Sequence, residues 1–136
     1  MAEPAKPSRL KPPRGHDNAW WWDEAARGKL ALQRCRGCAK LRHPPRPMCD
    51  ACGSLEWESI AASGRGTLHS FTVIHQPQFP GYDYPIVVAL VDLEEGERMI
   101  SNLVGCEPAK VRIGMELRAV IHADPDGFHI PFFRPA

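Results

Sequence analysis

The chain has 136 residues, with 17 Lys and Arg against 16 Asp and Glu, so its formal net charge at pH 7 is only +1. This near balance argues against a protein held mainly by nucleic-acid phosphates or by an anionic membrane. Hydrophobic residues make up 43% of the chain, enough for one domain core, and no apolar run reaches the ~18 residues that a bilayer requires. The N-terminus lacks an apolar signal-peptide core, so we expect a cytoplasmic protein whose five cysteines stay reduced.

Residues 1–16 are predicted to be a disordered tail. The segment is rich in proline, has no aromatic residue, and carries four basic residues against one acidic residue before His16. Such a composition buries too little apolar surface to offset the entropy lost on ordering. We therefore expect a solvated arm, with ordering along a partner as the alternative.

Residues 17–29 are predicted to form a short helix, which Asp17 or Asn18 caps and Gly28 ends. The helix carries three adjacent tryptophans, Trp20, Trp21 and Trp22. Adjacent helical side chains are about 100° apart, so these three rings spread over about 200° of the surface. One interpretation places two of them in the core and leaves the third half exposed. The other places at least one against a partner protein or an apolar ligand.

Residues 30–62 are predicted to be a zinc ribbon, because two C-x2-C pairs lie ten residues apart. Their ligands would be Cys35, Cys38, Cys49 and Cys52. Two such pairs, brought together by a hairpin, supply a tetrahedral four-sulfur site, which suits zinc. Gly37 and Gly53 are expected to provide positive φ angles at the two knuckles. Four sulfurs leave the metal no open coordination position, so we expect one structural zinc per chain.

Three alternatives to a zinc site are disulfides, a redox-active cysteine pair and an iron site. Disulfides are disfavoured in a reducing compartment, and a redox C-x2-C pair normally occurs singly at the start of a helix. Iron in the same four-sulfur cage stays open, since the ligand type alone does not exclude it. His43 is near enough in the sequence to replace a ligand, although four cysteines already complete the set.

Residues 63–136 are predicted to form an OB-fold barrel, which makes the whole chain mainly β. Five strand-like segments follow one another, with a helical turn at residues 107–110 between the third and the fourth. The segments cover residues 67–74, 86–91, 98–104, 115–121 and 127–133. The second segment is continuously apolar, which indicates burial on both faces or an interface on one of them.

Eight short motifs occur in an order that resembles a known family. They are Gly28-Lys-Leu, Gln33-Arg-Cys-Arg-Gly-Cys38, Pro44-Pro-Arg46, Cys49-Asp-Ala-Cys52-Gly53, Gly64-Arg-Gly66-Thr67, Ser70-Phe-Thr-Val73, Pro85-Ile-Val-Val-Ala-Leu-Val-Asp-Leu93 and Arg112-Ile-Gly-Met115. Together they resemble the acyl-CoA-associated OB-fold family with a rubredoxin-like zinc ribbon, long labelled a domain of unknown function. The resemblance runs from about Trp20 to Phe133, which is nearly the whole chain.

The resemblance implies a non-catalytic role. Members of that family are typically partners of thiolase-like enzymes, namely thiolases, hydroxymethylglutaryl-CoA synthases and the aldolases that shorten steroid side chains, and some help to hold the CoA substrate. It therefore implies an accessory subunit that assists acyl-CoA handling in a hetero-oligomer with two copies of each chain. The chain agrees in lacking the G-x-x-x-x-G-K, G-x-S-x-G and H-E-x-x-H motifs, and we predict no catalytic residue.

Two regions beside the tryptophans are candidates for contact with the partner or acyl-CoA. Arg46 of the ribbon has the charge that a CoA phosphate needs, and the loop with Phe79, Tyr82 and Tyr84 is aromatic and contains Gly81. The alternatives are a solvated ribbon surface and a packed barrel lid.

The competing function is a single-stranded nucleic-acid-binding module, a use that zinc ribbons and OB barrels both have. That function expects a basic face with exposed aromatic residues on the middle strands. Here the second strand is aliphatic and the barrel segment carries about as many acids as bases. We therefore expect neither a nucleic-acid nor a membrane partner.

Overall fold

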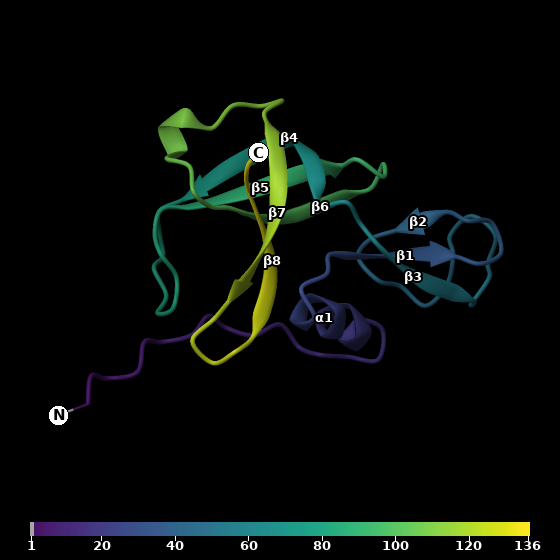
Figure 1. Ribbon diagram of the computed structural model, residues 1–136, viewed down its shortest axis with the longest axis horizontal. Coiled ribbons are helices and arrows are strands. Elements are labelled where there is room, and N and C mark those ends of the chain that lie inside the picture. The colour runs from purple at the N-terminus through teal and green to yellow at the C-terminus, as the bar shows by residue number, and fades with distance from the viewer. Residues whose placement is uncertain (1) are drawn as a thin grey trace.

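The structure is a computed structural model that describes residues 2–136, and it consists of one helix followed by two β modules (Figure 1). The elements are α1 (Ala19–Ala26), β1 (Ala31–Cys35), β2 (Leu41–Arg42), β3 (Trp57–Ala61), β4 (Arg65–Ile74), β5 (Ile86–Leu93), β6 (Arg98–Leu103), η1 (Pro108–Lys110), β7 (Glu116–Ala123) and β8 (His129–Pro135). Within residues 2–136 no helix is both long and apolar enough to cross a bilayer.

The larger module is a closed barrel of five strands in the order β4-β5-β6-β8-β7, with β7 returning to β4. All pairs are antiparallel except β6 and β8, and η1 lies between the third and fourth strands. This is the connectivity of an OB barrel. The predictions of a mainly β chain and of a five-stranded barrel are confirmed.

The barrel core explains the apolar β5 strand. Its alternate residues Val87, Ala89, Val91 and Leu93 are buried, and Phe133 of β8 is fully enclosed among them. The intervening residues of β5 point outward and are only half-buried. Of the two interpretations left open by the sequence, burial on both faces is therefore wrong, and one face of β5 is a partly exposed apolar surface.

The smaller module is a three-stranded sheet in the order β2-β1-β3, here called the ribbon. A buried glutamine, Gln33 on β1, fixes the proline-rich segment between the cysteine pairs. Its amide group accepts from the backbone N–H of Arg46 and donates to the Arg46 carbonyl, both at 3.0 Å. This pair of hydrogen bonds holds an extended segment that has no regular secondary structure of its own.

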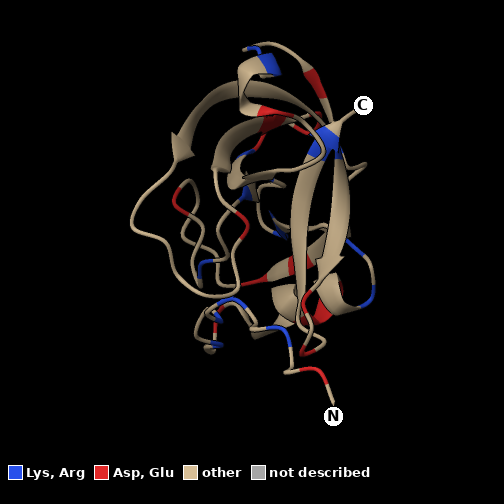
Figure 2. Cartoon of the chain, turned by 90° about the vertical axis from the view of Figure 1, so that its left-hand side faces the viewer, with Lys and Arg blue, Asp and Glu red and all other residues tan. Residues whose placement is uncertain are grey.

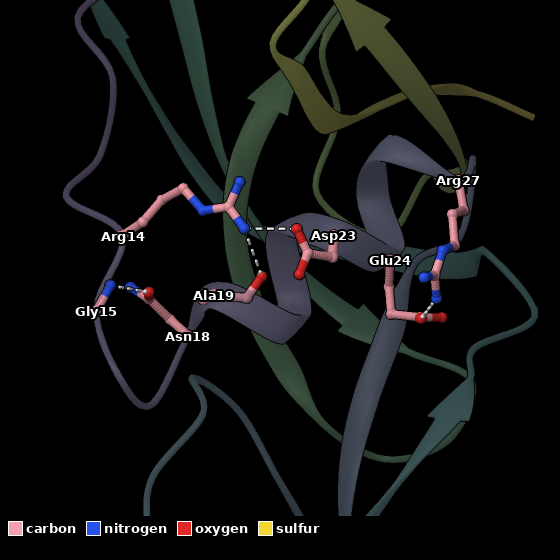
Figure 3. A network of polar contacts seen from close by, with 7 residues as sticks. All are labelled: Arg14, Gly15, Asn18, Ala19, Asp23, Glu24 and Arg27. Carbon is pink, nitrogen blue, oxygen red and sulfur yellow. Dashed lines mark hydrogen bonds and ion pairs between the residues drawn. The ribbon is translucent and has the colours of Figure 1, made fainter.

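Helix α1 starts at an N-cap that differs from the prediction. Asn18 holds the N-cap position, but its side chain makes no bond to the first helical turn. Its Oδ1 instead accepts from the Gly15 N–H at 2.7 Å, and Arg14 extends to Asp23 on the helix at 2.5 Å (Figure 3). The Asn18 side chain thus stabilises the turn before the helix, and Gly28 ends the helix with a φ of 81° as expected.

The N-terminal segment also differs from a wholly solvated arm. Arg9 and Lys11 contact the turn between β7 and β8. The first residues of the described chain are exposed, and the disordered tail stays a prediction. The proposed boundaries at residues 16, 29 and 62 stay predictions.

Candidate metal centre and partner surface

The four ribbon cysteines converge at one point. Their Sγ atoms all lie within 4.8 Å of one another, and the closest approaches are 3.5 Å between Cys35 and Cys52 and 3.6 Å between Cys38 and Cys49. Four thiolates around a zinc ion, with bonds of about 2.3 Å, are separated by about 3.8 Å. The cluster therefore fits one tetrahedrally bound metal ion.

The two knuckles use a positive φ angle at the same position, directly after the second cysteine of each pair. Gly53 has a φ of 74°, but the equivalent residue in the first knuckle is Ala39, with a φ of 65°, and the expectation for Gly37 is wrong. Gly37 is needed for space instead, because a Cβ there would lie 3.2 Å from the Cys52 sulfur. A glycine before the second cysteine therefore signals a close approach to the metal centre, whereas the left-handed residue follows that cysteine.

Backbone amides favour the thiolate form of two of the four cysteines, Cys35 and Cys49. The N–H of Cys38 and that of Gly37, which lies 3.3 Å from the Cys35 sulfur, together lower the pKa of Cys35 to about 6, against the opposing effect of burial. Donors aimed at sulfur stabilise the charged form that binds metals. Backbone donors lower the pKa of Cys49 as well, whereas hydrogen bonds with neighbouring cysteines outweigh the backbone donors at the other two thiols and raise the pKa of Cys38 and that of Cys52, the latter to about 11.

Two of the five basic side chains of the ribbon form ion pairs. Arg34 pairs with Glu58 and Lys40 pairs with Asp50. Arg46 is exposed, and it makes no ion pair within residues 2–136. The structure therefore leaves Arg46 available for an anionic ligand. Acidic and basic residues are otherwise interspersed along both modules (Figure 2).

The three tryptophans of α1 have three different environments. Trp21 is buried, donates its indole N–H to the Ala31 carbonyl at 2.8 Å and lies edge-on to Trp22. Trp20 is half-buried against Trp57 of β3, with ring centroids 4.6 Å apart. Trp22 is half-buried against Phe128. One ring therefore belongs to the core, while Trp20 packs on the ribbon and Trp22 on the turn between β7 and β8, so α1 lies at the junction between the modules.

A cavity of about 280 Å³, here called the Trp cleft, opens at this junction. Its walls come from α1, from residues 43–45 of the ribbon, from β6 and from β8, and they include Trp22 and Ile100. Ile100 is 71% exposed on the outer face of β6. An exposed isoleucine at the rim of an apolar cleft is a typical element of a binding surface.

Ile100 also begins an apolar strip across the outer face of the barrel. Its direct neighbour on β5 is Leu90, followed on the same face by Val88 and Ile86, and Ile86 pairs with Ile74 of β4. The strip joins the Trp cleft to the end of β4. Sequence reasoning did not single out Ile100, although it alternates with the buried Met99 and Ser101 and is thus an apolar residue on an outward position.

The aromatic loop between β4 and β5 is partly ordered by its own contacts. The Tyr84 hydroxyl accepts from the Phe79 N–H at 2.9 Å, and the Tyr82 and Tyr84 rings lie 6.2 Å apart. Phe79 is 53% exposed, whereas both tyrosines are half-buried. Of this loop, Phe79 is the side chain most available to a partner.

Comparisons with known proteins agree with this architecture. Residues 22–58 match the model of the ChsH2 rubredoxin-like zinc ribbon domain, and residues 59–122 match that of the ChsH2 C-terminal OB-fold domain. A DUF35 domain-containing scaffold protein of Methanothermobacter thermautotrophicus is 38% identical over 104 residues, which are 74% of this chain and 77% of that protein. The chain belongs to the ChsH2/DUF35 family.

Relatives within the ChsH2/DUF35 family have names that point to CoA chemistry. The 3-oxo-4,17-pregnadiene-20-carboxyl-CoA hydratase alpha subunit of Mycobacterium tuberculosis is 43% identical over 117 residues, which cover 86% of this chain and 37% of that protein. The benzoylsuccinyl-CoA thiolase subunit BbsA of Geobacter metallireducens is 38% identical over 72 residues, covering 53% and 48% of the two chains. The chain spans about two fifths of the length of the hydratase alpha subunits that it matches.

A solved structure of the ChsH2/DUF35 family resembles nearly the whole chain. It is a chain of the Ltp2-ChsH2(DUF35) aldolase, with a TM-score of 0.88 and 42% identity over 92% of this chain and 98% of that chain. The family and the fold expected from the sequence are thus confirmed.

His43 is the half-buried ionisable group on the wall of the Trp cleft. Its ring lies 5.5 Å from that of Trp21, and burial lowers the pKa of His43 to about 4. It stands on the wall of the Trp cleft and does not belong to the metal cluster formed by the cysteines. The histidine is therefore neutral in the folded protein at neutral pH.

This pKa predicts an acid-sensitive stability. Between pH 6.5 and 4 this histidine is protonated in the unfolded chain but stays neutral in the folded protein. The free energy of unfolding therefore falls as the pH falls. We expect a loss of up to about 2 kcal/mol between pH 7.5 and 5. Urea unfolding across this range should show a shallower pH dependence for His43→Gln. His75→Gln, at an exposed position, is the control; equal slopes in all three proteins would contradict the assignment.

Proposed function

We propose that the chain is a non-catalytic accessory subunit that binds a thiolase-like enzyme, of the thiolase or steroid side-chain aldolase type. In this role it assists acyl-CoA handling and complex assembly, and the complex contains two copies of each chain about a two-fold axis. The observation that carries the proposal is the similarity to the DUF35 chain of the Ltp2-ChsH2(DUF35) aldolase, which this chain matches over 98% of that chain's length. A single bound zinc ion in the cysteine cluster has a structural role.

The surface of the chain supports an accessory role. The apolar strip and the Trp cleft form one continuous apolar region that a monomer leaves partly exposed, and Ile100 lies where they meet. Exposed apolar regions of this kind are typical of protein interfaces. The partner contacts are therefore proposed to include Trp20, Trp22 and Ile100, with Trp21 supporting them from the core.

The remaining candidate contacts flank this region or the metal centre. Phe79 is proposed to reach the partner or the acyl chain, with Tyr82 and Tyr84 holding its loop. Arg46 is proposed to contact a CoA phosphate, because its guanidinium makes no ion pair within residues 2–136.

The contacts of Cys106, the cysteine outside the metal cluster, support the proposed absence of catalysis. Cys106 donates to the neighbouring Glu107 carbonyl at 3.6 Å, while His122, on β7, is bonded to Asp124 at 2.9 Å. A nucleophilic thiol needs a base as its hydrogen-bond partner. The partner of the Cys106 thiol is a backbone carbonyl, and no hydrogen bond joins this thiol to His122 within residues 2–136, so no catalytic role is proposed for Cys106.

Co-expression with the thiolase-like or aldolase subunit of the same organism tests the proposal. We expect a stable complex by size-exclusion chromatography with light scattering, with equal numbers of the two chains. Failure of every thiolase-like protein of that organism to bind the unmodified chain would contradict the proposed function.

The surface predicts a specific effect of one substitution. Ile100→Glu should weaken the complex at least tenfold, since it places a charge at the centre of the apolar region. Ile113→Glu is a matched control, because Ile113 is 69% exposed in the loop between η1 and β7, away from the strip and the cleft. Titration of the partner enzyme by calorimetry measures both affinities. Equal affinities for the two variants would place the interface elsewhere.

A further inference from the structure

Residues 8–11 cross one end of the barrel as an extended segment, here called the strap. In Figure 1 the N-terminal segment passes beside the turn that joins β7 to β8. The backbone N–H of Arg9 donates to Asp124 at 2.9 Å, and Lys11 forms an ion pair with Asp126. Asp124 is only 6% exposed, so the strap is bonded to a buried carboxylate of the barrel.

The other side of the strap contacts the aromatic loop. The Arg9 guanidinium lies 4.8 Å from the ring centroids of both Tyr82 and Phe132, a distance typical of cation–π interactions. Gly81 has a φ of 92°, and the strap passes so close to it that a Cβ would lie 2.5 Å from the Ser8 carbonyl carbon and 2.7 Å from the Arg9 nitrogen. The strap can therefore pass this close to the aromatic loop because residue 81 has no side chain.

The strap borders a cavity of about 510 Å³ in the barrel wall, which stays partly open to solvent. Arg9 forms part of the lining together with apolar side chains of β5, β6 and β7 and with the polar residues Asn102 and His122. The cavity is separate from the Trp cleft except where they share Asn102 and Phe132. Arg9 is the strap residue that forms one of its walls.

The contacts of the strap suit reversible release. Leu10 points to solvent and is 75% exposed, so the strap gains little from burial of apolar side chains. Asp124 keeps its bond from His122 when the strap leaves, which avoids an unpaired buried carboxylate. Segments held by a few polar contacts open at much lower free energy than the core unfolds.

We propose that residues 8–11 are a lid that partly covers the 510 Å³ cavity through Arg9 and that their release opens the cavity further to a small, partly apolar ligand. Gly81→Ala blocks the path of the strap without changing a residue that lines the cavity. Gly114→Ala is the matched control, since Gly114 has a φ of 89° and a Cβ there would meet nothing within 4 Å.

The experiment measures the strap and the cavity separately in the full chain. Hydrogen exchange of the residue 9 amide by NMR reports on the strap, and the fluorescence of anilinonaphthalene sulfonate reports on an open apolar cavity. In Gly81→Ala we expect exchange and dye fluorescence each to rise at least fivefold, with Gly114→Ala resembling the parent. Arg9→Ala removes the cation–π contacts and should raise both signals, and it serves as the test if Gly81→Ala fails to fold.

Two results would overturn the proposal. Equal protection of the residue 9 amide in Gly81→Ala and Gly114→Ala would show that the strap is not held along this path. Faster exchange of the residue 9 amide without an increase in dye fluorescence would show that the strap is released but does not cover the cavity. Neither result depends on binding of a thiolase-like partner.

Discussion

Replacement of Cys38 by serine will abolish metal binding and unfold the ribbon while the barrel stays folded. The ribbon sheet has strands of only two to five residues, whereas most of the buried core around Phe133 comes from the barrel, with Leu30, Ala31 and Leu32 joining it from the ribbon side. Structural zinc contributes on the order of 10 kcal/mol or more to small modules of this type, which exceeds the stability of most small domains. Loss of one of four sulfurs therefore removes the dominant stabilising interaction of the ribbon.

Elemental analysis and amide NMR check this result together. The parent protein should contain one zinc per chain, and Cys38→Ser should lose the dispersed signals of residues 30–62 while signals of β4–β8 persist. Cys106→Ser is the control, since Cys106 lies outside the cluster and should leave the zinc content unchanged. Folded parent protein without any metal would refute the assignment.

Replacement of Trp21 by alanine will lower the free energy of unfolding by about 3–5 kcal/mol, the range for truncation of a large buried aromatic side chain. Its ring fills the contact between α1 and the ribbon, near His43, and its indole N–H bonds the Ala31 carbonyl. The substitution therefore removes packing at the place where three parts of the chain meet.

Trp20→Ala provides the matched control, because it makes the same change one residue away on the same helix. Trp20 is half-buried, so truncation should cost less than about half as much. Urea unfolding of both variants measures the difference. Equal losses would mean that the buried position of Trp21 does not determine its contribution.

The sequence predicted the features that local chemistry determines. The spacing of Cys35, Cys38, Cys49 and Cys52 predicted one cluster, and the structure brings the four sulfurs together. The succession of short strands around one helical turn predicted the barrel, because each strand has its own pattern and the turn between β6 and β7 marks the topology. These signals lie within ten to twenty residues of one another.

The features that were missed depend on distant parts of the chain. The contact of Arg9 with Asp124 joins residues 115 positions apart, and nothing in a proline-rich basic segment indicates which carboxylate it meets. The role of Gly37 was misjudged because its constraint comes from the Cys52 sulfur of the other knuckle and not from its own φ angle. Long-range constraints of this kind leave no periodicity in the sequence.

The location of the tryptophans determines what the intrinsic fluorescence of the chain reports. All four belong to α1 or β3, where Trp20 stacks on Trp57 and Trp21 lies beside Trp22, and strands β4–β8 contain none. Intrinsic fluorescence therefore reports on the ribbon, on the Trp cleft and, through Trp21, on the core that Trp21 shares with the barrel. A partner that binds against Trp22 will change the emission without any label.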